Sequence, residues 1–361
     1  MKTLQYLYIF FIAVFLLLGL ISSNWFTADV STSTPKPPVE KQRGVHVFGR
    51  VDSSNLDRLH TNNVEWVTLV PWAAQDNTES PEVGHSDGDS LNIMYHDSSW
   101  VSQIQEFRSA GFKVFFKPHV WIRKPAEGKW RSDIFPAAEK DWTVWKETYR
   151  DFILRYARVA ERGEAEMFCV GTEFTRLSIE KPDYWRGLIR EVKTVYSGKL
   201  TYAANWYQEY EKVTFWDELD YIGIQAYFPL TENENPDTAE LAEGWRKHLP
   251  AIKSVRERYN KRVLFTEMGY KSSVDGAITP WEWIDYSADH DRLYSLETQA
   301  NCYRAFFASV WGQDWFAGVH LWQFRGDFKL RPGRINVDFN PQGKPAEVVI
   351  TEGFARQKEG R

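Results

Sequence analysis

Short hydrophobic runs recur along the chain from residue 44 onward, and amphipathic stretches separate them. Within each run the apolar residues are nearly continuous instead of alternating with polar ones. This pattern is typical of strands that are covered on both faces. It predicts eight buried strands, at residues 44–49, 64–72, 113–122, 165–174, 199–206, 221–230, 261–270 and 315–324.

Most of the stretches between these runs carry apolar residues three and four positions apart, which is the spacing of an amphipathic helix. Residues 182–198 also begin with Pro and end with Gly, as helices commonly do. The pattern is weakest in 210–220, which predicts only a short turn. The other clear helices are expected at 141–163, 239–260 and 295–312.

Eight strands that alternate with helices predict an α/β fold of the (β/α)8 TIM barrel type. The alternative is a doubly wound open sheet, which usually carries a glycine-rich phosphate loop after its first strand. Here the first run continues as "FGRVDSSN", residues 48–55, without a G-x-G-x-x-G motif. We therefore favour the barrel.

The N-terminal segment 1–24 contains a long apolar run, residues 4–21, behind Lys2. As a helix this run would be about 27 Å long, close to the thickness of a bilayer's hydrocarbon core. No clear small-residue cleavage site follows, so we favour a membrane anchor over a cleaved signal peptide. The positive charge on its N-terminal side predicts that the rest of the chain is extracytoplasmic, either anchored or secreted.

The remaining sequence divides into three predicted segments. Residues 25–42 are rich in Ser, Thr and Pro and predict a flexible linker. Residues 43–352 are expected to form one catalytic domain, and residues 353–361 a polar tail. No internal repeat or accessory binding module is visible, so this domain is expected to stand alone behind the linker. A monomer is expected.

Composition narrows the choice of partner. The net charge of -5 argues against nucleic acid and against an anionic membrane surface as partners. The only predicted contact with a membrane is therefore the N-terminal segment. Aromatic residues make up 16% of the chain, with 17 Trp. They can serve as core filler, but flat aromatic faces also suit sugar rings. A polysaccharide or oligosaccharide substrate is therefore a candidate partner.

Two cysteines, Cys169 and Cys302, lie in apolar contexts and predict buried free thiols, although a disulfide stays open. Two cysteines alone cannot form a zinc–thiolate site. His46 and His320 each stand without the second histidine of a His-x-His motif. No metal or other cofactor is predicted.

Two glutamates carry the candidate chemistry. Glu173 ends the fourth run, in "VGTEF", and Glu267 lies in the seventh, in "FTEMGY". The active site of a TIM barrel lies at the C-terminal ends of its strands, and strands four and seven stand nearly opposite one another. Glycoside hydrolysis needs two carboxyls, about 5 Å apart in retaining enzymes. Either glutamate alone could be a surface charge, but together they predict a catalytic pair.

Other polar side chains occur at the ends of the same strands. Lys117, His119 and Asn205 are candidate contacts to sugar hydroxyls, although each could instead have a structural role. Tyr227 is expected to donate a hydrogen bond to Glu267, with a place in the core as its alternative.

Aromatic residues at the strand ends are candidate platforms for sugar rings. Trp322 is the strongest of them, and a plug of the barrel is the alternative role for the others. Long loops at a barrel mouth commonly carry specificity, and two are predicted, at 73–99 and 271–295. The second contains "WEW", residues 281–283, as a further stacking or packing element. The other stacking candidates are Trp72, Trp121 and Trp206.

The motifs "VGTEF" and "FTEMGYKS" resemble glycoside hydrolase clan A. Within the clan, "FKPHVW", "FWDELDYIGIQAYFPL" and "FNPQGKPAEVV" resemble glycoside hydrolase family 113, over most of residues 44–350. The resemblance implies a retaining TIM-barrel enzyme, typically an endo-β-1,4-mannanase. It also implies that Glu173 is the acid/base and Glu267 the nucleophile.

One position departs from the wider clan. Many clan members place Asn before the acid/base, where it can bond the sugar 2-hydroxyl, and here that residue is Thr172. The predicted function is a retaining glycosidase acting on β-1,4-linked mannan or mannooligosaccharides. The alternatives are another glycan, such as a glucan or mixed hexosan, or a glycan-binding barrel without catalysis.

Overall fold

The computed structural model describes residues 40–84, 96–283, 293–329 and 336–358. In this part of the chain, eight parallel strands close into a barrel. They are β1 (Gln42–Phe48), β2 (Trp66–Leu69), β4 (Lys113–Phe116), β6 (Met167–Thr172), β7 (Lys199–Asn205), β8 (Tyr221–Gln225), β9 (Arg262–Met268) and β10 (Phe316–Arg325). Each pairs with its neighbours in the order β1-β10-β9-β8-β7-β6-β4-β2, and the predicted (β/α)8 fold is confirmed.

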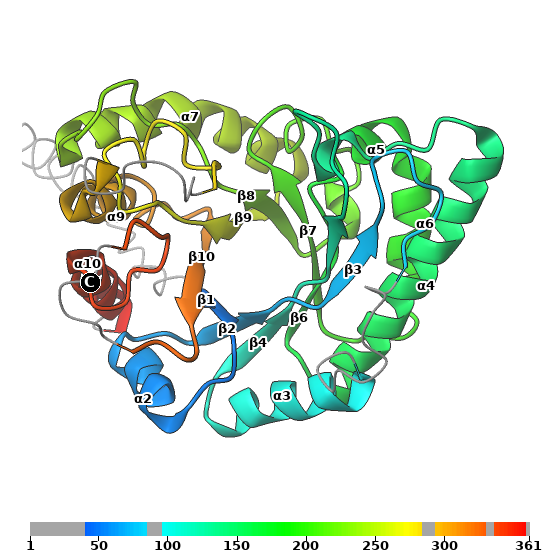
Figure 1. The fold of residues 1–361 in the computed structure, drawn as a ribbon, viewed down its shortest axis with the longest axis horizontal. Coiled ribbons are helices and arrows are strands. Elements are labelled where there is room, and N and C mark those ends of the chain that lie inside the picture. Colours follow the sequence, from blue (N-terminus) through cyan, green and yellow to red (C-terminus); the bar gives the residue numbers. More distant parts are fainter. Residues whose placement is uncertain (1–39, 85–95, 284–292, 330–335, 359–361) are drawn as a thin grey trace, which may run out of the picture. The chain divides into compact units, whose positions relative to one another are not determined.

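Figure 1 shows the helices on the outside of this ring of strands. The helices are α2 (Ser53–Thr61), α3 (Asp97–Ser109), α4 (Glu139–Gly163), α5 (Thr175–Glu180), α6 (Pro182–Val192), α7 (Thr238–Tyr259), α9 (Leu296–Ser309) and α10 (Pro345–Lys358). The described connection from β7 to β8 contains only the short 3-10 helix η3 (Trp216–Glu218). The weak pattern of residues 210–220 therefore corresponds to a turn, as predicted.

Two predicted strands are each divided in the structure. Residues 64–72 give β2 and the start of β3 (Trp72–Gln75), whereas 113–122 give β4 and β5 (His119–Ile122). Pro71 and Pro118 lie at the breaks, because proline has no N–H to donate to a ladder. Strands β3 and β5 pair with each other in a separate small sheet.

Helix α4 helps to fix the strand that precedes Glu173. The ring of Tyr149 is buried, and its hydroxyl donates a hydrogen bond to the carbonyl oxygen of Val170 in β6 at 2.9 Å. The next residue of β6 is Gly171, where a Cβ atom would lie 2.7 Å from the ring of Trp185 and 2.8 Å from that of Tyr202. The close packing of these two rings therefore requires glycine there.

Helix α10 continues past residue 352, where the predicted domain ends. Its Phe354 is fully buried, so the hydrophobic core includes residues beyond 352. The helix also pairs with α2 through Arg58 and Glu347, whose atoms Nε and Oε1 are 2.5 Å apart.

The predicted anchor or signal, residues 1–24, lies outside the described residues, as does most of the linker 25–42. Among the helices that the structure does describe, none is long and apolar enough to cross a membrane. Cys169 and Cys302 are both buried and both free, as their apolar contexts predicted.

Candidate active site

A cavity of about 950 Å³ opens among the residues that follow the C-terminal ends of the barrel strands. Glu173 follows β6 directly, and Glu267 is the penultimate residue of β9. Both line this cavity, although each is at least nine-tenths buried. The other predicted site residues that line it are Trp72, His119, Trp121, Asn205, Trp206, Tyr227 and Trp322.

Each carboxylate oxygen of Glu267 has its own donor. The hydroxyl of Tyr227 donates to Oε2 at 2.9 Å, which is the hydrogen bond that the sequence predicted. On the other side, the ammonium of Lys117 donates to Oε1 at 2.5 Å. These two contacts fix the plane of the carboxylate.

Lys117 does not take the place that the sequence predicted for it. Its side chain is fully buried and, in the described structure, is not among the cavity-lining residues. Besides Glu267, its Nζ contacts Nε2 of His46 at 3.1 Å and Oε1 of Gln225 at 3.1 Å. Burial lowers the pKa of Lys117, and the charge of Glu267 opposes that shift. Its position indicates a partner of Glu267 instead of a contact to sugar.

His119 lies between the two halves of the site. Its Nδ1 is 3.2 Å from Nη1 of Arg131, and because arginine can only donate, Nδ1 must accept. The proton is therefore on Nε2, which lies 3.5 Å from Oε1 of Glu267. Burial and the charges of Lys117 and Arg131 lower the pKa of His119 well below 6.5, so the ring is neutral.

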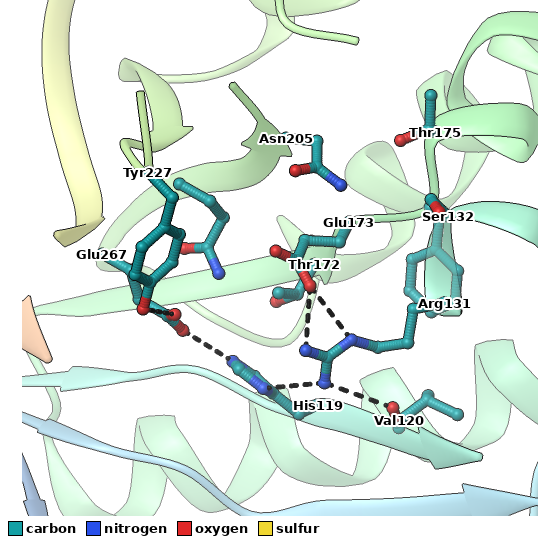
Figure 2. A network of polar contacts seen from close by, with 12 residues as sticks. His119, Val120, Arg131, Ser132, Thr172, Glu173, Thr175, Asn205, Tyr227 and Glu267 are labelled. Atoms are coloured by element: carbon teal, nitrogen blue, oxygen red, sulfur yellow. Dashed lines mark hydrogen bonds and ion pairs between the residues drawn. The ribbon is translucent and has the colours of Figure 1, made fainter. Parts of the chain in front are cut away.

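Glu173 is held by Arg131, which comes from the 3-10 helix η2 (Arg131–Asp133) after β5. Both Nη2, at 2.8 Å, and Nε, at 3.2 Å, donate to Oε2 of Glu173. Figure 2 shows the continuous chain of contacts that runs from Tyr227 through Glu267, His119 and Arg131 to Glu173. The two carboxylates thus belong to one network.

The model of Glycoside Hydrolase Family 113 matches residues 41–344. The chain belongs to glycoside hydrolase family 113.

Solved structures of family 113 resemble it closely in fold. One is described as a complex of a GH113 β-1,4-mannanase, with 28% identity, a TM-score of 0.74, and coverage of 88% of this chain and 99% of the other. Another is a GH113 β-mannanase from Alicyclobacillus acidocaldarius in complex with ManMIm, also with 28% identity, a TM-score of 0.74, and coverage of 88% and 98%.

More distant structures share the fold alone. The β-glucuronidase of Bifidobacterium dentium is 15% identical, with a TM-score of 0.54, over 88% of this chain and 47% of that one. Comparison with curated protein sequences gives no significant match.

The residue before Glu173 in this family 113 chain does not face the cavity. Thr172 is fully buried, and its hydroxyl donates to the carbonyl oxygen of Pro118 at 3.4 Å. It is also absent from the described cavity lining, so a contact from Thr172 to a sugar 2-hydroxyl has no support in the structure.

Two groups of aromatic rings in the family 113 cavity include exposed faces. In one, Trp121 packs edge-on against Trp72, with ring centroids 6.0 Å apart, and against Trp130 at 5.6 Å. In the other, Trp206 packs against Trp281 at 5.1 Å. Trp121 is 44% exposed and Trp281 is 42% exposed, so each offers a free face.

Trp322 lies deeper, at 6% exposure, with its ring centroid 4.9 Å from that of Phe48 and 6.2 Å from that of Trp283. Both pairs are edge-to-face. Trp281 and Trp283 are the two aromatics of the predicted "WEW" element, and both line the cavity.

Sequence reasoning missed Arg131, Trp130 and Phe339, which also line the cavity. The first two stand together as "KWR" in the loop after the third predicted strand, and the Arg131 guanidinium lies over the Trp130 ring at 4.8 Å. A basic residue beside an aromatic in a loop at the barrel mouth is the signal that could have found them.

Proposed function

We propose that this family 113 protein is a retaining glycoside hydrolase that cleaves β-1,4-linked mannan or mannooligosaccharides. In this proposal Glu173 is the acid/base and Glu267 the nucleophile. The observation that carries it is that both carboxylates line one cavity and join one network through His119 and Arg131. Family membership and the two mannanase structures support the substrate class.

The first step forms a bond between Glu267 and the anomeric carbon of the sugar and breaks the bond to the leaving oxygen. Glu173 gives its proton to that oxygen, so the departing chain leaves as a neutral alcohol. Tyr227 donates to Oε2 of Glu267 and Lys117 donates to Oε1 from within the barrel, so the two contacts hold the carboxylate in one orientation. The product of this step is a covalent glycosyl-enzyme.

The second step hydrolyses that intermediate. Glu173, now ionised, takes a proton from water, and the water oxygen attacks the anomeric carbon as its bond to Glu267 breaks. Two inversions give a product with the same β configuration as the substrate. The proton of His119 on Nε2 faces the region between the two carboxylates, where it can donate to a substrate hydroxyl.

Several sugar rings are proposed to bind along the aromatic lining. Trp322 is proposed to form the floor of the cavity beside the residues that contact Glu267. Trp72, Trp121 and Trp206 are proposed to bind further sugar rings, farther out along the same cavity. Asn205 lines the same cavity as a contact to sugar hydroxyls. The proposal includes an extracytoplasmic location for the domain that follows the N-terminal segment 1–24, because the proposed substrate is a polysaccharide.

The test is a substrate screen with the full-length chain, purified in a non-denaturing detergent. Mannan, glucomannan, cellulose and xylan oligosaccharides are compared by analysis of the released products. The proposal expects mannan and mannooligosaccharides to be cleaved most efficiently. Preferential cleavage of cellulose or xylan would contradict the substrate class, and binding without any cleavage would contradict catalysis.

A further inference from the structure

A third buried glutamate, besides Glu173 and Glu267, lies close to the site. Glu209 follows β7 and has no exposed surface, and it is absent from the described cavity lining. Among the described residues, no lysine, arginine or histidine nitrogen comes within ion-pair distance of its carboxylate. Burying a carboxylate without a cation costs several kcal/mol unless hydrogen bonds compensate it.

Four neutral groups donate to this carboxylate. Oε1 accepts from the hydroxyls of Tyr202, at 2.5 Å, and Ser178, at 2.8 Å. Oε2 accepts from the backbone N–H of Asn205, at 2.7 Å, and from the hydroxyl of Thr175, at 3.0 Å. Burial raises the pKa of Glu209 to about 7, and these hydrogen bonds oppose that shift.

The donors come from two neighbouring strand ends. Thr175 and Ser178 belong to α5, which begins two residues after Glu173, whereas Asn205 ends β7 and lines the cavity. Glu209 therefore joins the segment that carries the proposed acid/base to the segment that carries a proposed sugar contact.

The backbone at Glu173 itself needs such support. Its φ of 58° lies in the left-handed region, which is unfavourable for a residue other than glycine. The N–H of the next residue, Phe174, donates to the hydroxyl of Tyr202 at 2.9 Å, and that hydroxyl donates in turn to Glu209. A relay of two hydrogen bonds thus connects Glu209 to the turn that aims Glu173.

We propose that Glu209 is a positioning residue that holds Glu173 in its left-handed turn and so sets the reach of the acid/base toward the leaving oxygen. The inference rests on the proposed role of Glu173. It predicts that loss of the Glu209 carboxylate impairs protonation of the leaving group more than it impairs attack by Glu267. A 1 Å error in the place of a catalytic group can cost about 100-fold in rate.

The experiment compares kcat/KM of the full-length chain and its E209Q variant on two aryl β-mannobiosides. Phenyl is a poor leaving group that needs the acid, whereas dinitrophenyl leaves without protonation. For E209Q we expect kcat/KM to fall about 10- to 100-fold on the phenyl substrate and less than about threefold on the dinitrophenyl substrate. The ratio of the two values cancels any loss of folded enzyme, so a purely structural defect leaves it unchanged.

Two further variants complete the test. Y202F keeps the carboxylate but removes the hydroxyl between Phe174 and Glu209, and it should shift the ratio in the same direction. E166Q is the matched control, because Glu166 also accepts a backbone N–H, that of Val114 at 2.7 Å, but stands just before β6 at the opposite end of that strand. Its ratio should match that of the wild type.

The outcomes separate this inference from the proposed function. If E173A is selective between the two substrates but E209Q and Y202F lose activity equally on both, the role of Glu209 is overturned alone. If E173A is not selective, the acid/base assignment fails and the inference fails with it. In the E173A background, E209Q should change kcat/KM by less than about twofold, since the group that it positions is gone.

Discussion

The ammonium of Lys117 lies 2.5 Å from Oε1 of Glu267 inside the barrel, and both side chains are buried. A charge pair in such a place is costly to disrupt, because removal of one partner leaves the other buried and uncompensated. Lys117 therefore supports both the fold and the orientation of the proposed nucleophile.

Lys117→Met should lower kcat/KM by at least about 100-fold and the free energy of unfolding by about 3–5 kcal/mol. The reason is that the buried carboxylate of Glu267 then loses the donor that orients Oε1 and the positive charge beside it. Steady-state kinetics and urea unfolding measure the two effects. Lys113→Met is the control, since Lys113 begins β4, the strand that Lys117 directly follows, and pairs with Glu65 at 2.6 Å at the opposite end of that strand. Near-normal activity of Lys117→Met would contradict this role.

The strand on which Lys117 was expected could be predicted from the sequence, but the position of its side chain could not. The hydrophobic runs predicted each barrel strand, because two-sided burial leaves a strong local pattern. The same pattern predicted a single strand at 113–122, and this wrongly put Lys117 at the mouth of the barrel. Pro118 divides that run, so Lys117 stays beneath the cavity while His119 begins an outer strand. Pro118 is present in the sequence, and because proline has no N–H to donate to a neighbouring strand, it could have indicated that the strand is divided there.

Other parts of the site had no local signal. Glu209 lies in the stretch "YQEYEK", where acidic residues normally suggest an exposed turn. Its burial depends on hydroxyls from α5 and β7 that meet only in the folded chain. Arg131 likewise gains its role from a contact with Glu173 across 42 positions. Contacts of this kind depend on tertiary packing, which sequence periodicity does not encode.

Glu173→Ala should reduce kcat/KM on mannan by about 1,000-fold or more but spare dinitrophenyl β-mannobioside to within about tenfold. Only the natural leaving group needs the proton. Glu180→Ala is a matched control, because Glu180 lines the same cavity but is half-exposed and pairs with Arg176 at 2.9 Å. Equal losses on both substrates would count against an acid role for Glu173.

Trp281→Ala should raise KM for long mannooligosaccharides about tenfold, with little change in kcat. The exposed ring of Trp281 is proposed to stack on a sugar that binds equally well before and during the reaction. Kinetics on oligosaccharides of increasing length measure this, and the shortest substrates act as the internal control. A fall in kcat at every chain length would argue for a role in packing the loop.

His320→Gln should make the stability of the protein less sensitive to acid. Burial and the nearby His46 and Lys117 lower the pKa of His320 well below 6.5. Below that pH the unfolded chain therefore takes up a proton that the folded chain does not, and the free energy of unfolding falls. The variant should lose about 1.4 kcal/mol less per pH unit than the wild type. Urea unfolding at about pH 7 and pH 5 tests this, and parallel losses would contradict it.

A double displacement at the anomeric carbon through Glu267 retains the configuration of the sugar. Proton NMR of the first sugar released from a mannooligosaccharide, recorded before the anomers equilibrate, measures that configuration. The β anomer should form first, and the α anomer should appear only later, by mutarotation. An α anomer as the first product would contradict the retaining mechanism.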